Sequence, residues 1–111
     1  MGQKTQGRRL PDVEEGILPG SLDDLQEGDY WLIKDPDCGY SPGPENLTGL
    51  LLGIWPPKVG GVAVLSLHTV REEEDGTVSV RYGDGSSNSI LVSNASASWH
   101  GFIEHGVWEE C

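Results

Sequence analysis

Apolar and β-branched residues along the chain occur in short runs that are separated by glycine, proline and acidic residues. Runs of this length are typical of β-strands, because helices of globular domains need longer periodic segments. We expect strands over residues 30–34, 50–55, 62–70, 77–82 and 89–93. The segment 62–70 is predicted as one strand, which returns through a solvated glutamate turn at residues 72–76 to pair with 77–82.

The end of the chain carries the most specific local pattern. Two apolar segments flank residues 105–106, a His-Gly pair in which the glycine readily adopts the positive φ of a tight turn. A two-residue turn at this position sets Ile103 opposite Trp108 and His100 opposite Cys111. The sequence therefore predicts a C-terminal β-hairpin, anchored by an aromatic–aliphatic pair.

Helical signals are sparse. Ser21 resembles a helix N-cap followed by acidic residues, and Gly28 limits the segment to a short helical turn. Residues 1–20 show no sustained periodicity, so we expect a flexible N-terminal arm, ordered only near residues 17–18. Residues 21–111 are then a single β-rich domain, an all-β antiparallel sandwich or partly open barrel that ends in the hairpin.

The composition agrees with such a fold. Hydrophobic residues make up 36% of the chain, while 16 glycines and 7 prolines favour turns and short strands. The four tryptophans compensate for the scarcity of aliphatic side chains, so we expect at least three of them to be mostly buried. A tryptophan left on the surface near His100 and Phe102 would mark a binding patch. The candidate binding residues are Trp99, His100, Phe102 and Trp108.

The charge is strongly negative and unevenly distributed. The formal net charge is −11, yet residues 1–10 hold three cations and no acid. An acidic body repels phosphates, which argues against direct binding of nucleic acid. Two interpretations stay open: the acidic surface keeps the protein soluble, or it attracts a partner protein with a basic surface.

Two cysteines do not make a disulfide framework, and no apolar run has the length of a membrane span. Residues 1–20 also lack the apolar stretch of a signal peptide. We therefore expect a cytoplasmic protein without membrane contact.

Thiolate and imidazole groups suit tetrahedral zinc, and the chain offers Cys38, His100 and Cys111, with His68 or His105 as a fourth ligand. The hairpin register brings two of these together. The alternative is that Cys38 is an ordinary loop thiol and that His100 packs beside a tryptophan, because the sequence contains no Cys-x-x-Cys pair.

Catalytic motifs are not recognisable in the sequence. No serine or cysteine lies in the context of an activated nucleophile, so we expect a protein that is not an enzyme. His68 or His100 beside a carboxylate is the remaining alternative for acid–base chemistry in a hydrolase.

Several short motifs follow one another in the second half of the chain. They are His-Thr-Val at 68–70, Asp-Gly-Thr at 75–77, Ser-Asn-Ser-Ile at 87–90, and Trp-His-Gly-Phe-Ile at 99–103 with Gly106. In this order they resemble a family of short proteins of unknown function from bacteria and tailed phages, especially those of actinobacteria. Many members carry a Cys-x-x-Cys pair and a cysteine before the final histidine, which implies zinc. Here Cys38 stands alone and Trp99 replaces that cysteine, so the resemblance implies a shared fold and a phage or prophage origin.

The leading hypothesis is a small, acidic, non-enzymatic domain that is encoded by a phage or prophage and modulates a host protein by binding it. No cofactor is required in this interpretation. The alternatives are a zinc-stabilised structural module of the resembling family and a structural component of a virion.

Overall fold

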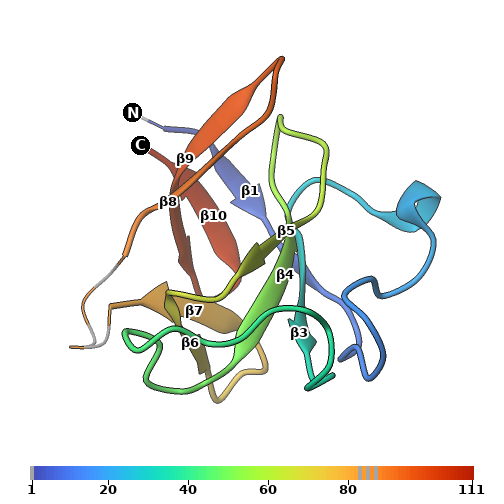
Figure 1. The fold of residues 1–111 in the computed structure, drawn as a ribbon. Coiled ribbons are helices and arrows are strands. Elements are labelled where there is room, and N and C mark those ends of the chain that lie inside the picture. Colours follow the sequence, from blue (N-terminus) through green and yellow to red (C-terminus); the bar gives the residue numbers. More distant parts are fainter. Residues whose placement is uncertain (1, 83, 85, 87) are drawn as a thin grey trace.

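The computed structural model describes residues 2–82, 84, 86 and 88–111. Over these residues it contains ten short strands and one single-turn 3-10 helix (Figure 1). The strands are β1 (Lys4–Gln6), β2 (Arg8–Arg9), β3 (Asp29–Ile33), β4 (Leu51–Trp55), β5 (Ala63–Leu65), β6 (Thr69–Glu72), β7 (Val78–Arg81), β8 (Ile90–Ser93), β9 (Ser98–Glu104) and β10 (Val107–Glu110), and the helix is η1 (Leu22–Asp24). The predicted all-β fold is confirmed, and the sheets of the described chain do not close into a barrel.

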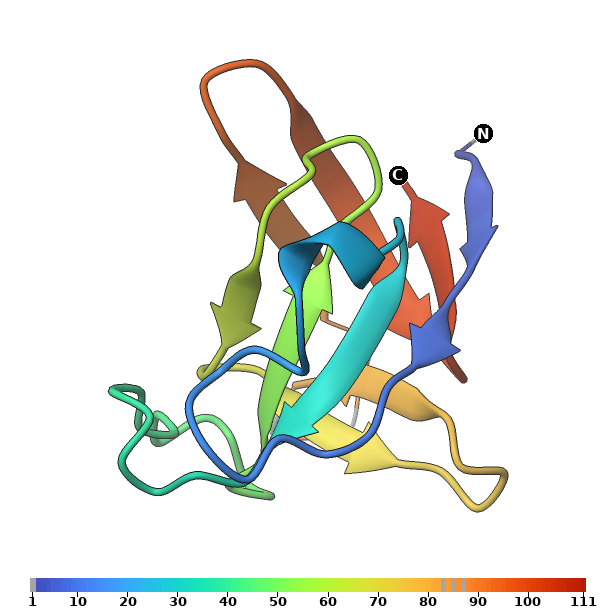
Figure 2. The same ribbon diagram turned by 90° about the vertical axis from the view of Figure 1, so that its right-hand side faces the viewer.

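The strands form two four-stranded sheets and a two-stranded ribbon (Figure 2). We call the sheet of order β1-β10-β9-β8 the terminal sheet and the sheet of order β2-β3-β4-β5 the central sheet, while β6 and β7 form the ribbon. The short β2–β3 pair is parallel, and the other strand pairs are antiparallel. The ribbon joins the terminal sheet through a bond from Gly106 N–H to Val78 C=O (2.9 Å).

A single bent segment near the N-terminus connects the two sheets. Its first part pairs with β10 as β1, and its second part pairs with β3 as β2. Gly7 lies at the bend, where its N–H donates to Gly106 C=O at 2.8 Å. A Cβ atom at position 7 would lie 2.3 Å from that oxygen, so only glycine allows the two backbones to approach this closely.

The main core lies between the terminal sheet, the central sheet and the ribbon. Alternate residues of each strand point into it, because side chains of a β-strand alternate between its two faces. Its largest buried side chains are Trp99, Trp108, Tyr30, Leu32, Leu52, Ile54, Ile90 and Ile103. Apolar residues from every sheet are therefore removed from water in one continuous cluster.

The central sheet is buried on its second face as well. Trp31 and Ile33 point away from the main core and are covered by Val13, Ile17 and Leu25 from the preceding segment. The Trp31 indole N–H donates to Ile17 C=O at 2.7 Å. This explains why β3 is apolar at consecutive positions: both of its faces are covered.

The expectation of a flexible arm over residues 1–20 is therefore wrong for residues 4–13. These residues form β1, β2 and a further bridge between Val13 and Ile33, and Val13 is buried. Met1, which belonged to the predicted arm, lies outside the described residues. The segment is ordered by contacts with β3 and β10, which are far away in the sequence.

An ion pair between a buried carboxylate and a half-exposed guanidinium fastens this segment to β3. Arg8 donates to both carboxylate oxygens of Asp29, from Nε at 3.0 Å and from Nη2 at 2.7 Å. Asp29 is only 1% exposed, and the Gln26 N–H also donates to it at 2.8 Å. The same carboxylate raises the pKa of the Arg8 guanidinium. A bidentate pair of this kind fixes both position and orientation.

The predicted single strand over residues 62–70 is also wrong. The segment divides into β5 in the central sheet and β6 in the ribbon. Between them, Ser66 C=O accepts bonds from Gly43 N–H (3.0 Å) and the Asn46 side-chain amide (3.2 Å), both in a loop. Alternating apolar residues continue through the break, which is why the pattern alone did not reveal it.

The remaining expected elements are confirmed. Strands β3, β4, β7 and β8 match the four other predicted segments, and their ends differ from the predicted ends by at most one residue. The short turn of η1 follows Ser21, whose hydroxyl accepts from Asp23 N–H at 3.2 Å. No helix of the described residues is long and apolar enough to cross a membrane.

Candidate functional site

The C-terminal hairpin has the geometry that the sequence predicts. His105 and Gly106 both adopt a positive φ, 48° and 76°, as a two-residue type I′ turn requires. Ile103 pairs with Trp108, and Cys111 N–H donates to the carbonyl of His100 at 2.9 Å. Strands β9 and β10 therefore present one buried and one solvent-facing row of side chains.

Two of the four candidate binding residues belong to the core. Trp99 and Trp108 are 2% and 0% exposed, with their ring centroids 5.1 Å apart at an angle of 74°. The Trp108 indole N–H donates to Gly28 C=O at 2.8 Å. With Trp31 also buried, the expected burial of at least three tryptophans is confirmed. Trp99 and Trp108 thus hold the sheets together and do not form a binding surface.

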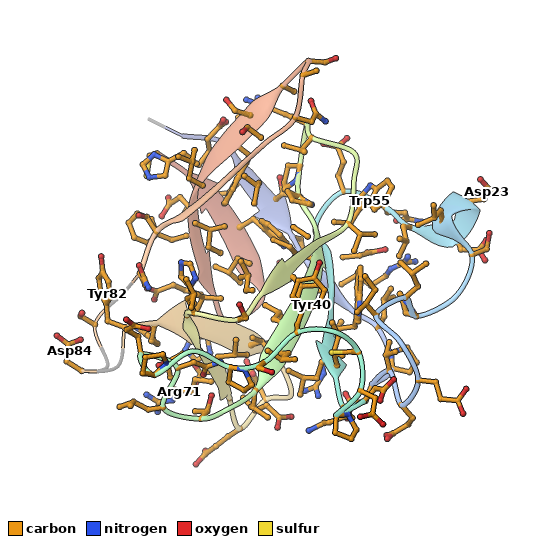
Figure 3. All side chains as sticks on the ribbon, in the orientation of Figure 1. Asp23, Tyr40, Trp55, Arg71, Tyr82 and Asp84 are labelled. Atoms are coloured by element: carbon orange, nitrogen blue, oxygen red, sulfur yellow. The ribbon has the colours of Figure 1, made fainter. Side chains whose placement is uncertain are left out.

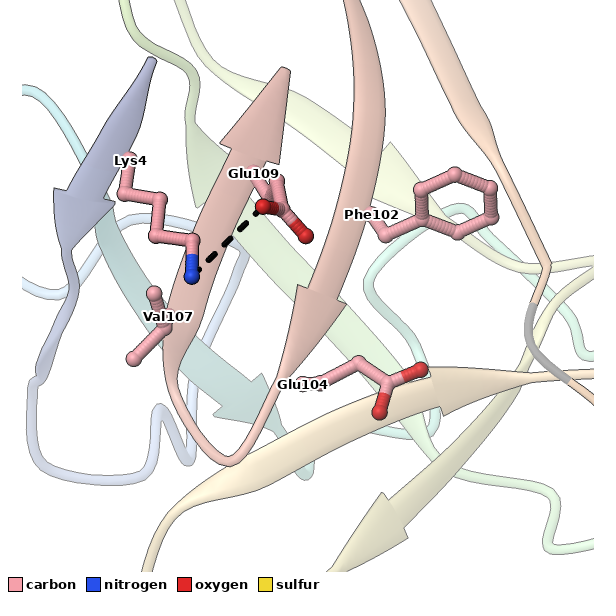
Figure 4. Close-up of a pocket in the computed structure, with 5 residues that line it drawn as sticks. All are labelled: Lys4, Phe102, Glu104, Val107 and Glu109. Atoms are coloured by element: carbon pink, nitrogen blue, oxygen red, sulfur yellow. Dashed lines mark ion pairs between the residues drawn. The ribbon is translucent and has the colours of Figure 1, made fainter. Parts of the chain in front are cut away.

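The other two candidates, His100 and Phe102, point outward from the terminal sheet. We call this surface the outer face; it consists of Lys4, Leu91, His100, Phe102, Glu104, Val107 and Glu109. Phe102 and Val107 border a shallow depression of about 360 Å³ with Lys4, Glu104 and Glu109 (Figure 4). The outer face is a small apolar patch with charged edges.

Charges on the outer face are largely balanced. Lys4 lies 3.6 Å from Glu109, and Arg81 lies 3.5 Å from Glu104. Exposed pairs of this kind contribute little to stability, but they cancel the local field. The excess negative charge of the protein therefore lies elsewhere.

The candidate zinc ligands do not form a common site. His100 and Cys111 lie next to each other in the terminal sheet, but Cys38 lies in the loop after β3 and packs against the second cluster of the central sheet. The Cys38 thiol contacts the Tyr40 carbonyl at 3.6 Å. No group of three or more His, Cys, Asp and Glu side chains within the described chain is placed to hold a metal ion.

The other two histidines have different surroundings. His68 Nε2 lies 3.0 Å from the carbonyl of Ser89. His105 lies between two carboxylates of the ribbon, 3.6 Å from Glu73 and 3.7 Å from Asp75. Each ring therefore has protein partners other than Cys38.

One part of the glutamate turn differs from the sequence-based expectation. Glu73 was predicted to be solvated, yet its side chain is only 8% exposed. It accepts from the Ser79 hydroxyl at 2.5 Å, and that hydroxyl accepts from His105 N–H at 2.8 Å. Arg71 Nε lies 3.2 Å from the other carboxylate oxygen. The buried serine thus links the ribbon to the terminal hairpin, a role that no local motif indicates.

The excess negative charge is concentrated in two segments that flank β3. Residues 10–28 and 34–49, which we call the acidic loops, contain nine acids and one cation, Lys34. They therefore account for −8 of the net charge of −11. Asp35 connects the two segments because it accepts from Gly16 N–H at 2.6 Å, and this bond is the main cause of its lowered pKa.

A groove of about 330 Å³ lies within the acidic loops, between the end of β3 and the loop that leads to β4. Its apolar lining consists of Ile33, Pro36, Tyr40, Pro42, Leu50 and Leu51. Lys34 and Asp35 are the charged residues at this groove. None of the binding residues predicted from the sequence lies at this groove. Proline- and glycine-rich loops without aromatic runs give no sequence signal of a preformed surface.

The molecule was compared with known proteins by family model, by sequence and by structure. No family model, curated protein or solved structure matches the chain. The functional interpretation therefore depends on the surfaces described above and on the motifs in the sequence.

Proposed function

We propose that the protein is a small, acidic, non-enzymatic domain that binds a host protein through a basic surface of that partner. The observation that carries this proposal is the separation of charge: the acidic loops hold −8, whereas the outer face is balanced by ion pairs. A one-sided negative field attracts and orients a cationic protein surface. The resemblance to phage proteins supports an origin in a phage or prophage and a partner in the bacterial host.

The exposure of carboxylates in the acidic loops supports a role in binding rather than in stabilising the fold. A carboxylate that completes the fold has donors within the protein, as Asp29 has Arg8 and Asp35 has the Gly16 N–H. Glu14, Glu15 and Asp23 are exposed instead, and none of them makes an ion pair within the described chain. Their charges repel one another, and a basic partner would relieve that repulsion.

The test is capture of the partner from an actinobacterial lysate, followed by measurement of its affinity at different salt concentrations. We expect affinity to fall at least about tenfold between roughly 50 and 300 mM salt, because screening shortens the reach of exposed charges. An affinity that does not change with salt would exclude a basic partner.

Matched variants locate the interaction. The first replaces three carboxylates of the acidic loops by amides: Glu14→Gln, Glu15→Gln and Asp23→Asn. The control replaces three exposed carboxylates elsewhere, with the same change in net charge: Glu74→Gln, Asp84→Asn and Glu109→Gln. We expect the first variant to weaken binding more than the control; equal losses would show that only total charge matters.

A further inference from the structure

We propose that the groove in the acidic loops is the docking site for an extended segment of the partner with an apolar, proline-containing centre and arginine or lysine at its ends. This inference rests on the proposed function and specifies how the basic partner is held. Three features of the groove support it: its lining, its rigidity and the charge that surrounds it.

The lining combines core residues, Ile33 and Leu51, with an exposed aromatic rim. Tyr40 is 44% exposed at the groove, beside prolines 36 and 42. Aromatic and proline side chains that border a groove suit an extended proline-containing segment, which loses little conformational entropy on binding.

The loop that forms one wall is held in place before any partner arrives. Asn46 is 6% exposed, and its side-chain amide donates to Leu50 C=O at 2.8 Å and to Ser66 C=O at 3.2 Å. The Thr48 hydroxyl donates to Val70 C=O at 2.8 Å. A preformed wall avoids the cost of ordering a loop upon binding.

The charge around the groove selects the sign of the occupant. Asp35 lines it, and Asp37 and Glu45 are exposed on the adjoining loop. Lys34 also lines the groove, so the four charged residues at and beside it carry a net charge of −2. Charge complementarity therefore favours cationic residues at both ends of an apolar centre.

Tyr40 and Tyr82 form a natural pair of test positions. Both rings are exposed, 44% and 51%, and they lie in different parts of the molecule (Figure 3). Tyr40 borders the groove, whereas Tyr82 follows β7 at the end of the ribbon. Replacing either ring by alanine removes similar exposed apolar area, and circular dichroism would confirm that each variant folds.

The experiment uses fluorescence anisotropy with labelled peptides and the full chain. The main probe is Arg-Arg-Pro-Leu-Pro-Leu-Arg-Arg; one control peptide has serine at the four central positions, and another has glutamate in place of arginine. We expect the main probe to bind best and Tyr40→Ala to weaken its binding about tenfold, as loss of an aromatic contact at a docking site does. Tyr82→Ala should leave the affinity unchanged.

Three results would overturn the groove as the docking site: no binding of the main probe, equal binding of the serine peptide, or equal effects of the two tyrosine variants. If both cationic peptides bind equally and Tyr40→Ala has no effect, the groove is excluded, but attraction of a basic partner to the acidic loops remains. Loss of that attraction is detected separately by the salt dependence of the captured partner.

Discussion

The terminal sheet and the acidic loops use their side chains in opposite ways. The terminal sheet places its tryptophans in the core and pairs the charges of its outer face, Lys4 with Glu109 and Arg81 with Glu104. The acidic loops leave most of their carboxylates in solvent and keep an apolar groove between them. The difference indicates that the aromatic pattern of this chain marks what stabilises the fold, while its charge pattern marks the surface that we propose for a partner.

The largest expected effect separates the core tryptophans from the outer face. Trp108→Ala should lower the free energy of unfolding by about 3–5 kcal/mol, because it leaves a cavity among fully buried side chains. Phe102→Ala, on the partly exposed outer face, should lower it by roughly 1 kcal/mol or less. Urea denaturation followed by circular dichroism measures both. A loss for Phe102→Ala as large as that for Trp108→Ala would show that the outer face is covered by packing.

The next effect concerns how the first acidic loop is attached. Asp29→Asn removes one charge from the pair with the half-exposed Arg8, and we expect the melting temperature to fall by roughly 5 °C. Hydrogen exchange should become faster in residues 8–28, because this pair joins β2 to β3. Lys4→Gln is the control, since it breaks an exposed pair, and it should change neither quantity measurably. Equal effects of the two variants would contradict a specific role for Asp29.

The parts of the fold that sequence reasoning predicted are those with local causes. The hairpin turn depends on two adjacent residues, His105 and Gly106, whose backbone preferences are visible in the sequence. The strand before Pro56 is visible for the same reason, because a short apolar run ends at a residue that cannot donate a backbone hydrogen bond. Local preferences therefore established the all-β class and most strand positions.

The parts that were missed depend on contacts between distant segments. Arg8 and Val13 become ordered because β3 is apolar on both faces and needs a cover on the second one. The break at Ser66 arises because a distant loop provides its hydrogen-bond donors. The burial of Glu73 requires Ser79, which reaches it only after the ribbon has formed. Sequence periodicity holds no information on such pairings.

The candidate site also has features with local causes and features that depend on distant contacts. His100 and Phe102 lie on one face, because side chains alternate along a strand. Burial of Trp99 and Trp108 follows from the position of the sheet in the fold, which a single strand does not reveal. The groove at Tyr40 was missed because its rigidity comes from Asn46, whose partners lie in other segments.

The smallest expected effect compares one aspartate of the ribbon turn with one of the acidic loops. The pKa values of Asp75, in the ribbon, and Asp35, in the acidic loops, are both lowered, but by different donors. The largest cause for Asp75 is the Thr77 hydroxyl, which donates to it at 2.5 Å, whereas backbone N–H groups act on Asp35. Because the folded-state pKa is lowered, each carboxylate stabilises the fold above its unfolded-state pKa of about 3.9, and this contribution is lost as pH falls through the folded-state pKa.

Thr77→Val should therefore raise the pKa of Asp75 toward its ordinary value and leave the pKa of Asp35 unchanged. The stabilisation from Asp75 at neutral pH would decrease, and what remains would be lost at a higher pH during acid titration. Carboxyl ¹³C chemical shifts followed against pH measure the two residues separately. If the pKa of Asp75 stayed low in this variant, the backbone N–H of Thr77 and the nearby His105 would be the main causes of the shift. The pKa values of Asp75 and Asp35 would then not differ in being set by a side chain and by the backbone.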